Sequence, residues 1–352
     1  MISKLTKKAI ELLKKLIETQ SFSGEEEGTA LLIQGWFAQN TIPFQRDNNN
    51  IWATNKHFDA SKPTILLNSH HDTVKPNKAY TKNPLKSEII DGKLYGLGSN
   101  DAGGSLVSLI ATFTYFYEQK NLKYNLIILA SAEEENSGTN GIRSVLPSLP
   151  KINFAIVGEP TQMNLAIAEK GLLVLDCYAH GKSGHAAHGT GENAIYKAFE
   201  AIDWFKNYHF PTISETLGEI KITVTQIEAG KQHNVIPATC HFVVDLRVTD
   251  VYSLAEVLTI IKENVNVDVK ERSLRNNSSS IALDHPIVKS GLKLGRKTYG
   301  SPTMSDQTAL TCPSLKLGPG ESLRSHTADE FIYVSEVEEG IELYIKIINE
   351  II

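Results

Sequence analysis

The stretch Thr64-Ile65-Leu66-Leu67-Asn68-Ser69-His70-His71-Asp72-Thr73-Val74 decides how this chain is read. An apolar run of strand length ends abruptly in two adjacent imidazoles and a carboxylate. Such groups are unfavourable to bury unless they bind one another or a ligand. The pattern therefore indicates a buried strand whose carboxyl end carries a functional site.

Similar apolar runs recur along the first half of the chain. They occupy residues 51–53, 126–130 and 154–157. Apolar residues at helical spacing predict helices near 5–17 and 105–118, and Ser23 with Glu26 three residues later predicts a capping box before another helix. Buried strands that alternate with helices are typical of a largely parallel α/β sheet. We therefore expect an α/β domain with a mostly parallel sheet and helices on both faces.

The pattern changes after Glu169, where longer strands and an alternation of apolar and polar residues predict a smaller antiparallel α+β domain. The polar stretch 272–280 reads as a linker. A chain of 352 residues also exceeds the usual size of one hydrophobic core. We expect the smaller domain at residues 168–276, inserted into a larger domain formed by residues 1–167 and 277–352.

The composition limits the partners and the compartment. The formal net charge is -5, and without a basic tract we expect neither nucleic acid nor an anionic membrane as partner. We expect no signal peptide and no membrane span. Three widely separated cysteines, Cys177, Cys240 and Cys312, argue against a disulfide framework and favour a reducing cytoplasm.

Polar clusters lie at the predicted strand ends, where open α/β sheets place their ligands. The clusters contain His70-His71-Asp72, Asp101, Glu133-Glu134-Glu135, Glu159 and His326. Each alone has an ordinary alternative, a satisfied loop or a solvated helix end. The glutamate triplet directly follows a buried strand, however, and burying like charges is costly unless a cation offsets them. Imidazoles and carboxylates without thiolate suit a pair of zinc, cobalt or manganese ions.

With these motifs in this order, the chain resembles the M20 family of dinuclear metallohydrolases over essentially its whole length. The resemblance implies a set of metal ligands: His70, Asp101, Glu135, Glu159 and His326. It makes Asp101 the carboxylate that bridges both ions, Asp72 the partner that orients His70, and Glu134 the general acid and base. His71 falls at the unspecified position of the His-x-Asp segment, which leaves it as a packed or solvent-facing histidine.

The segment after the bridging aspartate departs from the family pattern. Many members have Lys or Arg two residues after that aspartate, whereas this chain reads Asp101-Ala102-Gly103-Gly104. Gly103 therefore puts in doubt any role assigned to that cation, and no proposed ligand is lost.

The smaller domain carries a second set of residues with a family resemblance. His185 in Gly181-Lys182-Ser183-Gly184-His185-Ala186 is similar to the histidine that the family's lid domain sends into the partner subunit's active site to stabilise an oxyanion. A homodimer through this domain would follow. Asn234 and Arg247 resemble positions that contact substrate. The open alternatives are a surface-loop histidine for His185 and a pair within the strand with Asp245 for Arg247.

The resemblance implies a zinc-dependent amidohydrolase that acts on a small N-acyl amino acid, and within the family the chain looks most like acetylornithine deacetylase and succinyl-diaminopimelate desuccinylase. N-acetylornithine, N-acetylcitrulline or an N-succinyl analogue would be the substrate, in arginine biosynthesis. The alternatives are a dipeptidase or aminoacylase of the same family, or a non-catalytic metal-binding scaffold. The presence of Glu134 argues against the scaffold.

Overall fold

The computed structural model describes residues 2–352 and divides the chain into two compact units, which are treated separately. Unit 1 contains the residues up to Ile167, Ser280–Tyr299 and Ser305–Ile352, and unit 2 contains Ala168–Ser279 and Gly300–Met304. The sequence places residues 300–304 in the larger domain. They fall in unit 2, where the Lys170 N–H donates to the Ser301 carbonyl at 3.3 Å. The predicted limits 168 and 276 stay a prediction.

A mixed sheet forms the centre of unit 1. Its middle strands run parallel in the order β6 (Asn125–Ser131), β3 (Thr64–His70), β7 (Phe154–Val157) and β17 (Ser314–Lys316). The remaining strands of this sheet are β1 (Gln45–Asp47), β2 (Asn50–Thr54), β8 (Leu165–Glu169), β15 (Ser279–Ser280) and β16 (Thr298–Ser301). Strands β2 and β8 pair antiparallel with β6 and β17, respectively. The predicted α/β class with a mostly parallel central sheet is confirmed.

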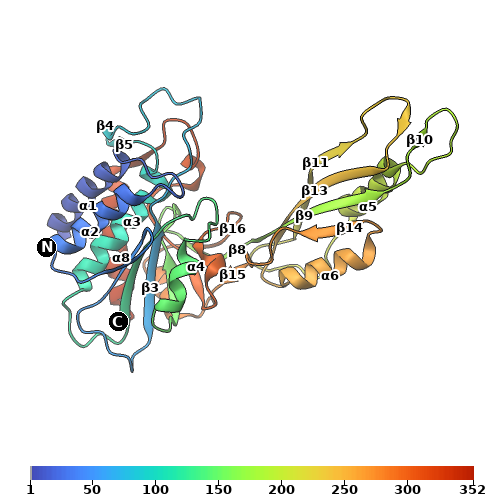
Figure 1. Cartoon of the computed structure of the whole chain (residues 1–352). Helices are drawn as coiled ribbons and strands as arrows, with labels where there is room; N and C mark the ends of the chain where they lie inside the picture. Colours follow the sequence, from blue (N-terminus) through green and yellow to red (C-terminus); the bar gives the residue numbers. More distant parts are fainter. Residues whose placement is uncertain (1) are drawn as a thin grey trace. The chain divides into compact units, whose positions relative to one another are not determined.

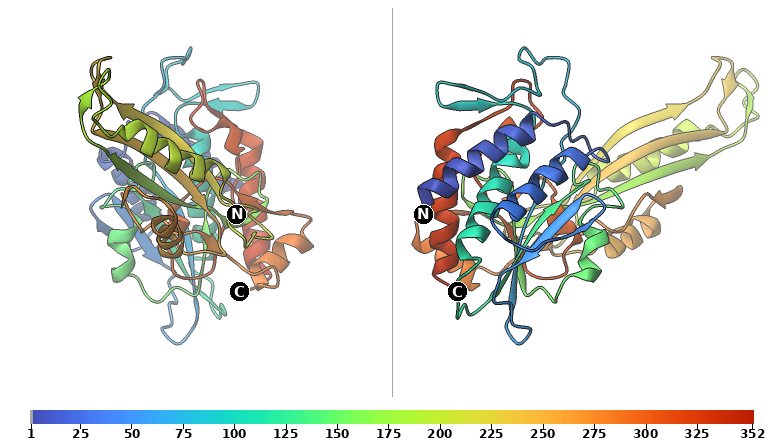
Figure 2. Two further views of the ribbon diagram at one scale, coloured as in Figure 1. Left: turned by 90° about the vertical axis from the view of Figure 1, so that its right-hand side faces the viewer. Right: turned by 60° about the vertical axis from the view of Figure 1, so that its left-hand side comes forward.

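Helices cover both faces of this sheet, because both faces of its central strands are apolar (Figures 1 and 2). In β3, Ile65 and Leu67 join one hydrophobic cluster, whereas Leu66 joins the other. The first cluster contains residues of α1 (Ile2–Ile17), α2 (Glu27–Gln39), α3 (Gly104–Phe116), α7 (Pro286–Lys293) and α8 (Val334–Asn349). The second contains residues of α4 (Ile142–Val145). The period of two along a strand thus produces the predicted layers.

Unit 1 also has a smaller antiparallel sheet of β4 (Glu88–Ile90), β5 (Lys93–Tyr95) and β18 (Phe331–Tyr333). Short helical turns lie at η1 (Ser99–Gly103), η2 (Leu146–Ser148), η3 (Asp306–Ala309) and η4 (Ser322–Arg324). Turn η1 leads directly into α3, and η4 lies just before the loop that contains His326.

Unit 2 is an antiparallel sheet with helices (Figure 1). The strands lie in the order β11 (Lys221–Ala229), β13 (Thr239–Val248), β9 (Gly171–His180) and β14 (Asp268–Glu271), and the helices are α5 (Ala194–Asn207) and α6 (Leu254–Asn264). A short ladder joins β10 (Gly184–His185) to β12 (Val235–Ile236). Alternate residues of β13, among them Phe242, Val244 and Leu246, are buried against the helices. The α+β pattern that the sequence predicts for this region is therefore present.

The predicted capping box before α2 is wrong. The helix begins at Glu27, with Glu26 as its N-cap residue, and the Ser23 hydroxyl donates to Asp72 Oδ2 at 2.7 Å. A buried carboxylate that lacks a hydrogen bond is less favourable than a helix end that water can reach. The Ser23 hydroxyl consequently donates to the Asp72 carboxylate and does not cap α2.

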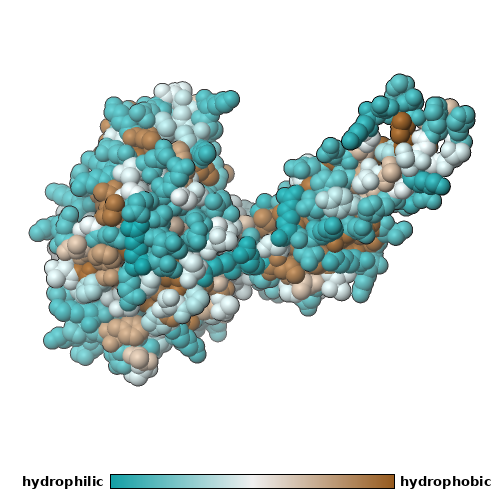
Figure 3. Space-filling model, in the orientation of Figure 1, coloured by the Kyte–Doolittle hydropathy of each residue, from teal (hydrophilic) through white to brown (hydrophobic). Residues whose placement is uncertain are grey.

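No helix within residues 2–352 is both long and apolar enough to cross a bilayer. Hydrophilic residues dominate the visible face of each unit (Figure 3). The cysteines carry free thiols, and Cys177 and Cys240 are buried in the core of unit 2.

Candidate functional site

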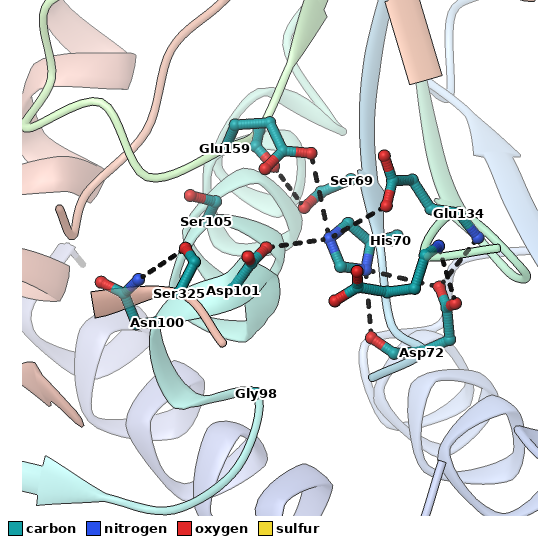
Figure 4. A network of polar contacts seen from close by, with 12 residues as sticks. Ser69, His70, Asp72, Gly98, Asn100, Asp101, Ser105, Glu134, Glu159 and Ser325 are labelled. Atoms are coloured by element: carbon teal, nitrogen blue, oxygen red, sulfur yellow. Dashed lines mark hydrogen bonds and ion pairs between the residues drawn. The ribbon is translucent and has the colours of Figure 1, made fainter. Parts of the chain in front are cut away.

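Polar side chains of unit 1 meet at the carboxyl ends of three neighbouring parallel strands. His70 ends β3, Glu134 follows β6, and Glu159 follows β7. The Nε2 atom of His70 lies 4.0 Å from Glu134 Oε2 and 3.9 Å from Glu159 Oε1. Figure 4 shows both carboxylates directed toward the imidazole. Parallel pairing brings these ends to one edge of the sheet, which is where open α/β sheets bind ligands.

Asp101 lies between the two histidines of the site. Its Oδ1 is 3.2 Å from His70 Nε2, and its Oδ2 is 3.6 Å from His326 Nε2. Asp101 belongs to η1, and the peptide bond between Asp101 and Ala102 is cis. His326 also approaches Glu135, with 3.0 Å between Nε2 and Oε2.

These residues form two groups whose ligand atoms lie within 4.8 Å of one another: His70, Asp101 and Glu159, and Asp101, Glu135 and His326. Asp101 is common to both groups. Imidazole and carboxylate donors are what zinc, cobalt or manganese requires, and a shared carboxylate is the ligand that can bridge two ions. The residues therefore fit a pair of divalent cations. Glu134 and Asp72 belong to neither group among the described residues.

The electrostatics of the cluster also favour a cation. Burial raises the pKa of Glu134 well above its usual value, and burial together with the Asp101 charge raises that of Glu159 to about 8, although His70 opposes both shifts. Burial alone would lower the pKa of His70, but bonds to Asp101 and Asp72 raise it well above its usual value. The hydrogen bond to Glu135 raises the pKa of His326 to about 9. Crowded carboxylates take up protons or pair with histidines, and a divalent cation would relieve the same repulsion.

Asp72 connects the strand that carries His70 to the loop after β6. Its carboxylate accepts the backbone N–H groups of Glu134 and Glu135, each at 3.1 Å, and lies 3.4 Å from His70 Nδ1. Burial favours the protonated acid. The hydrogen bond and the charge of His70, followed by the hydrogen bonds from the Ser23 hydroxyl and the Glu135 N–H, nevertheless keep the pKa of Asp72 below its usual value. Asp72 is therefore an acceptor that fixes its surroundings.

The neighbouring histidine, His71, is held by residues outside the two ligand groups. His71 is buried, and its ring contacts the Thr29 hydroxyl at 2.8 Å and the Asn49 carbonyl at 2.8 Å. Burial lowers the pKa of His71, so the neutral ring is favoured. Of the two readings that the sequence left open, the packed histidine is the one observed.

The backbone at Gly103 leaves no room for a side chain, which accounts for glycine where the resemblance leads us to expect Lys or Arg. A Cβ atom at this position would lie 2.4 Å from the Gly98 carbonyl oxygen and 2.7 Å from Leu13 Cδ1. Both distances are below van der Waals contact. Glycine at position 103 is thus required by the packing of η1 in this chain.

Several buried polar residues next to the site escaped the sequence analysis. The Glu330 carboxylate accepts the N–H groups of Gly98, Asn100 and Asp101 and so holds the turn that carries Asp101. The Asp306 carboxylate accepts hydrogen bonds from the side chains of Asn68 on β3 and Ser131 on β6, at 2.8 and 2.5 Å. Lys316 is buried on β17, and its charge lowers the pKa of Glu159. Only Glu330 had a sequence signal, because it closes the segment that contains His326.

The other predicted site residues lie in unit 2. His185 pairs with Val235 in the short ladder, and the Ala186 N–H donates to the Asn234 carbonyl at 3.0 Å, so the structure brings His185 and Asn234 together. His185 is exposed. Arg247 forms a two-pronged ion pair with Asp245, at 2.9 and 3.1 Å. The pair within the strand, the alternative for Arg247, is thus the arrangement observed.

Comparison with known proteins identifies relatives of the whole chain. Residues 66–350 match the model of peptidase family M20/M25/M40. Acetylornithine deacetylase of Shigella sonnei is 28% identical, with 97% of each chain covered. Succinyl-diaminopimelate desuccinylase of Wolbachia pipientis is 25% identical, covering 97% of this chain and 92% of its own. A dinuclear metal-binding peptidase of Bacillus subtilis has a similar fold, with a TM-score of 0.72, 14% identity and 98% of each chain covered.

Proposed function

Because this chain belongs to peptidase family M20/M25/M40, a family of hydrolases, we propose that it is a metal-dependent amidohydrolase that removes the acyl group from an N-acyl amino acid. N-acetylornithine is the first candidate substrate, with N-acetylcitrulline and the N-succinyl analogues next, in arginine biosynthesis in the cytoplasm. Two relatives that are similar along their whole length and named as deacylases support this choice. The free thiols fit a reducing compartment.

The observation that carries the proposal is the position of Asp101, which is shared by two groups of ligand atoms. We propose that these groups hold two divalent ions, zinc first and cobalt or manganese as alternatives, with His70 and Glu159 on one ion and Glu135 and His326 on the other. Bound there, the ions would acidify a shared water and polarise the amide carbonyl.

The protein's own groups would move the protons. Glu134 lies 4.0 Å from His70 Nε2, next to both ligand groups, and burial raises its pKa, which favours proton uptake. We assign Glu134 as the base that takes a proton from the attacking water and returns it to the leaving amine. Asp72 would keep Glu134 and His70 in place through its hydrogen bonds.

We further propose that unit 2 contributes His185, Asn234 and Arg247 to the reaction, the first for the oxyanion and the others for the substrate. Arg247 would have to exchange Asp245 for the substrate carboxylate, since it is paired in this structure. Asp245→Asn should then lower KM, because it frees the guanidinium. An unchanged KM would contradict this role of Arg247.

A homodimer through unit 2 is part of the same proposal. Tyr196 and Phe199 of α5 are 71% and 67% exposed, and Ile227 on β11 is 60% exposed. Strand β11 is the outermost strand of its sheet, and open edges and exposed apolar side chains are typical of interfaces. Light scattering should show a dimer that Phe199→Asp converts to monomers, whereas a monomeric wild type would rule the interface out.

The test is release of free amine from a panel of N-acetyl and N-succinyl derivatives of ornithine and citrulline, N-acetylmethionine and dipeptides, with and without chelator. Chelator-sensitive turnover of an acylated ornithine or citrulline supports the proposal. Turnover of dipeptides alone favours the peptidase alternative. Glu134→Gln should abolish turnover and keep both metals, with the exposed Glu25→Gln as control. Metal binding without turnover of any substrate would favour the scaffold.

A further inference from the structure

The backbone of the segment that carries the proposed base is held by side chains from other parts of unit 1. We call residues 132–135, which follow β6, the base loop. Its four successive N–H groups all donate to side-chain oxygens. The pairs are Ala132 to Asn50 (3.0 Å), Glu133 to Glu26 (3.2 Å), Glu134 to Asp72 (3.1 Å) and Glu135 to Asp72 (3.1 Å).

Glu26 is the unexpected member of this set. Its relative exposure is 0%, although glutamate is rarely buried without a partner. The carboxylate also accepts the Gly24 N–H at 2.6 Å and the Asn49 side-chain amide at 2.9 Å. The amino end of α2 tolerates a negative charge there, yet an exposed carboxylate would serve the helix equally well. The burial of Glu26 thus points to a role outside α2.

The residue that Glu26 holds has an unusual backbone conformation. Glu133 has a φ of 53°, in the left-handed region that residues with a side chain rarely adopt. Its carboxylate accepts from the backbone and side chain of Asn140, each at 3.0 Å, and its carbonyl accepts the Gly138 N–H at 2.9 Å. This turn sets the direction of the backbone at the next residue, Glu134. Contacts that maintain the turn therefore also aim the proposed base.

We propose that Glu26 is a positioning residue for Glu134, which it controls through the Glu133 N–H. This inference rests on the proposed hydrolase function. Without the acceptor, Glu133 can leave the left-handed region, and the Glu134 carboxylate then moves away from His70. A displacement of about 1 Å in a catalytic group can lower the rate roughly 100-fold. The position of Glu134 depends on a Glu26 oxygen that lies within hydrogen-bond distance of the Glu133 N–H, and it depends less on the charge of Glu26.

Three substitutions in the metal-loaded enzyme separate reach from charge. Glu26→Gln keeps an oxygen within reach of the Gly24 and Glu133 N–H groups, removes the charge, and loses only the hydrogen bond from the Asn49 side chain. Glu26→Asp keeps the charge and withdraws the oxygens by one methylene. Glu26→Met preserves the volume and has no oxygen. Glu25→Met, at the exposed neighbouring position, is the matched control.

We expect kcat to fall tenfold to a hundredfold for Glu26→Asp and Glu26→Met, with KM within twofold and two metals still bound. Glu26→Gln should stay within threefold of the wild type, as should the control. Wild-type kcat in a folded Glu26→Asp variant, or a larger loss for Gln than for Asp, would overturn the proposal. Because the Asp and Gln variants decide, failure of Glu26→Met to fold does not affect the test.

Hydrogen exchange keeps this test independent of the substrate. If the wild type hydrolyses nothing in the panel, the proposed function fails, but the hold on the base loop is still measurable. The Glu133 amide should exchange faster in Glu26→Asp and remain protected in Glu26→Gln. Equal protection in both variants would show that Glu26 does not hold this amide.

Discussion

The N–H of Glu134 donates to Asp72 Oδ1 at 3.1 Å, which joins the proposed base to the end of the neighbouring strand. The other oxygen of the same carboxylate accepts the Glu135 N–H at 3.1 Å. Asp72 is 1% exposed. One buried side chain thereby ties Glu135, a proposed metal ligand, to the proposed base and to the histidine of β3. Figure 4 shows the contacts of Asp72 with Glu134 and His70.

Replacement of Asp72 by asparagine should weaken metal binding, because the amide group places a donor against one of the two N–H groups. Partners that orient metal ligands typically contribute about 10-fold to 100-fold in affinity or activity. We expect a loss of that size in zinc affinity, measured by competition with a chromogenic chelator. The exposed Asp284→Asn is the control, and equal affinities of the two variants would contradict the prediction.

The two groups of ligands predict different metal contents for two variants. Asp101 belongs to both groups, so Asp101→Ala should retain less than one equivalent of metal after dialysis. His326 belongs to one group, so His326→Ala should retain about one equivalent, since two carboxylates and one imidazole remain for the other ion. Plasma mass spectrometry of the dialysed proteins gives the ratios. Two equivalents in Asp101→Ala would refute the bridging role.

Two glycines of unit 1 should respond to alanine in opposite directions. At Gly103 the new Cβ would lie 2.4 Å from the Gly98 carbonyl oxygen, and overpacking of this kind costs about 1–3 kcal/mol of unfolding free energy. At Gly35, inside α2, a Cβ meets no atom within 4 Å beyond its chain neighbours and the surrounding helix backbone, and alanine should stabilise the protein by about 0.5–1 kcal/mol. Urea unfolding measures both effects. A Gly103→Ala variant as stable as the wild type would contradict the packing argument.

The unfolding free energy of unit 2 should depend on pH through the protonation of Asp176. Hydrogen bonds from Arg272 and His241, against partial burial, lower the pKa of Asp176 to about 2 from its usual 3.8. Because the folded state binds the proton more weakly, the stabilisation is complete above about pH 4 and is lost as the pH falls toward 2. After a discount for solvent screening, Asp176→Asn should cost about 1 kcal/mol at pH 7 and only a fraction of that at pH 2, where the folded-state carboxyl group is about half protonated.

Urea unfolding of both proteins across that pH range measures the difference in unfolding free energy. The exposed Asp250→Asn should show no such pH dependence. A constant difference between wild type and Asp176→Asn from pH 7 to pH 2 would sink the assignment.

Local sequence predicted the strands and helices that surround the site. The run from Ile65 to Leu67 is apolar at every position, and β3 is accordingly buried on both faces. The alternation in residues 240–248 predicted one buried face of β13, because a strand repeats every two residues. The sequence also predicted that the metal ligands are imidazoles and carboxylates, since the chemistry of a ligand is a property of the side chain.

Hydrogen-bond partners within the site could not be read from the sequence. Ser23 matched the pattern of a helix cap, yet its hydroxyl donates to Asp72. Glu26 and Asp306 gave no pattern that separates them from surface carboxylates, and Glu330 was marked only by its place in the segment that contains His326. Their burial depends on which backbone N–H groups come within reach, and that is set by packing between distant segments.

The sequence by itself determined the element types, the parallel α/β class and the kinds of donor available at the strand ends, because these follow from local periodicity and side-chain chemistry. Only the tertiary structure decided which donors meet. His326 lies 191 positions from Glu135, and they come within 3.0 Å because strand register and loop closure place both at one edge of the sheet. Contacts between such distant positions carry no local periodicity, so the family resemblance, and no local pattern, placed both residues in one expected site.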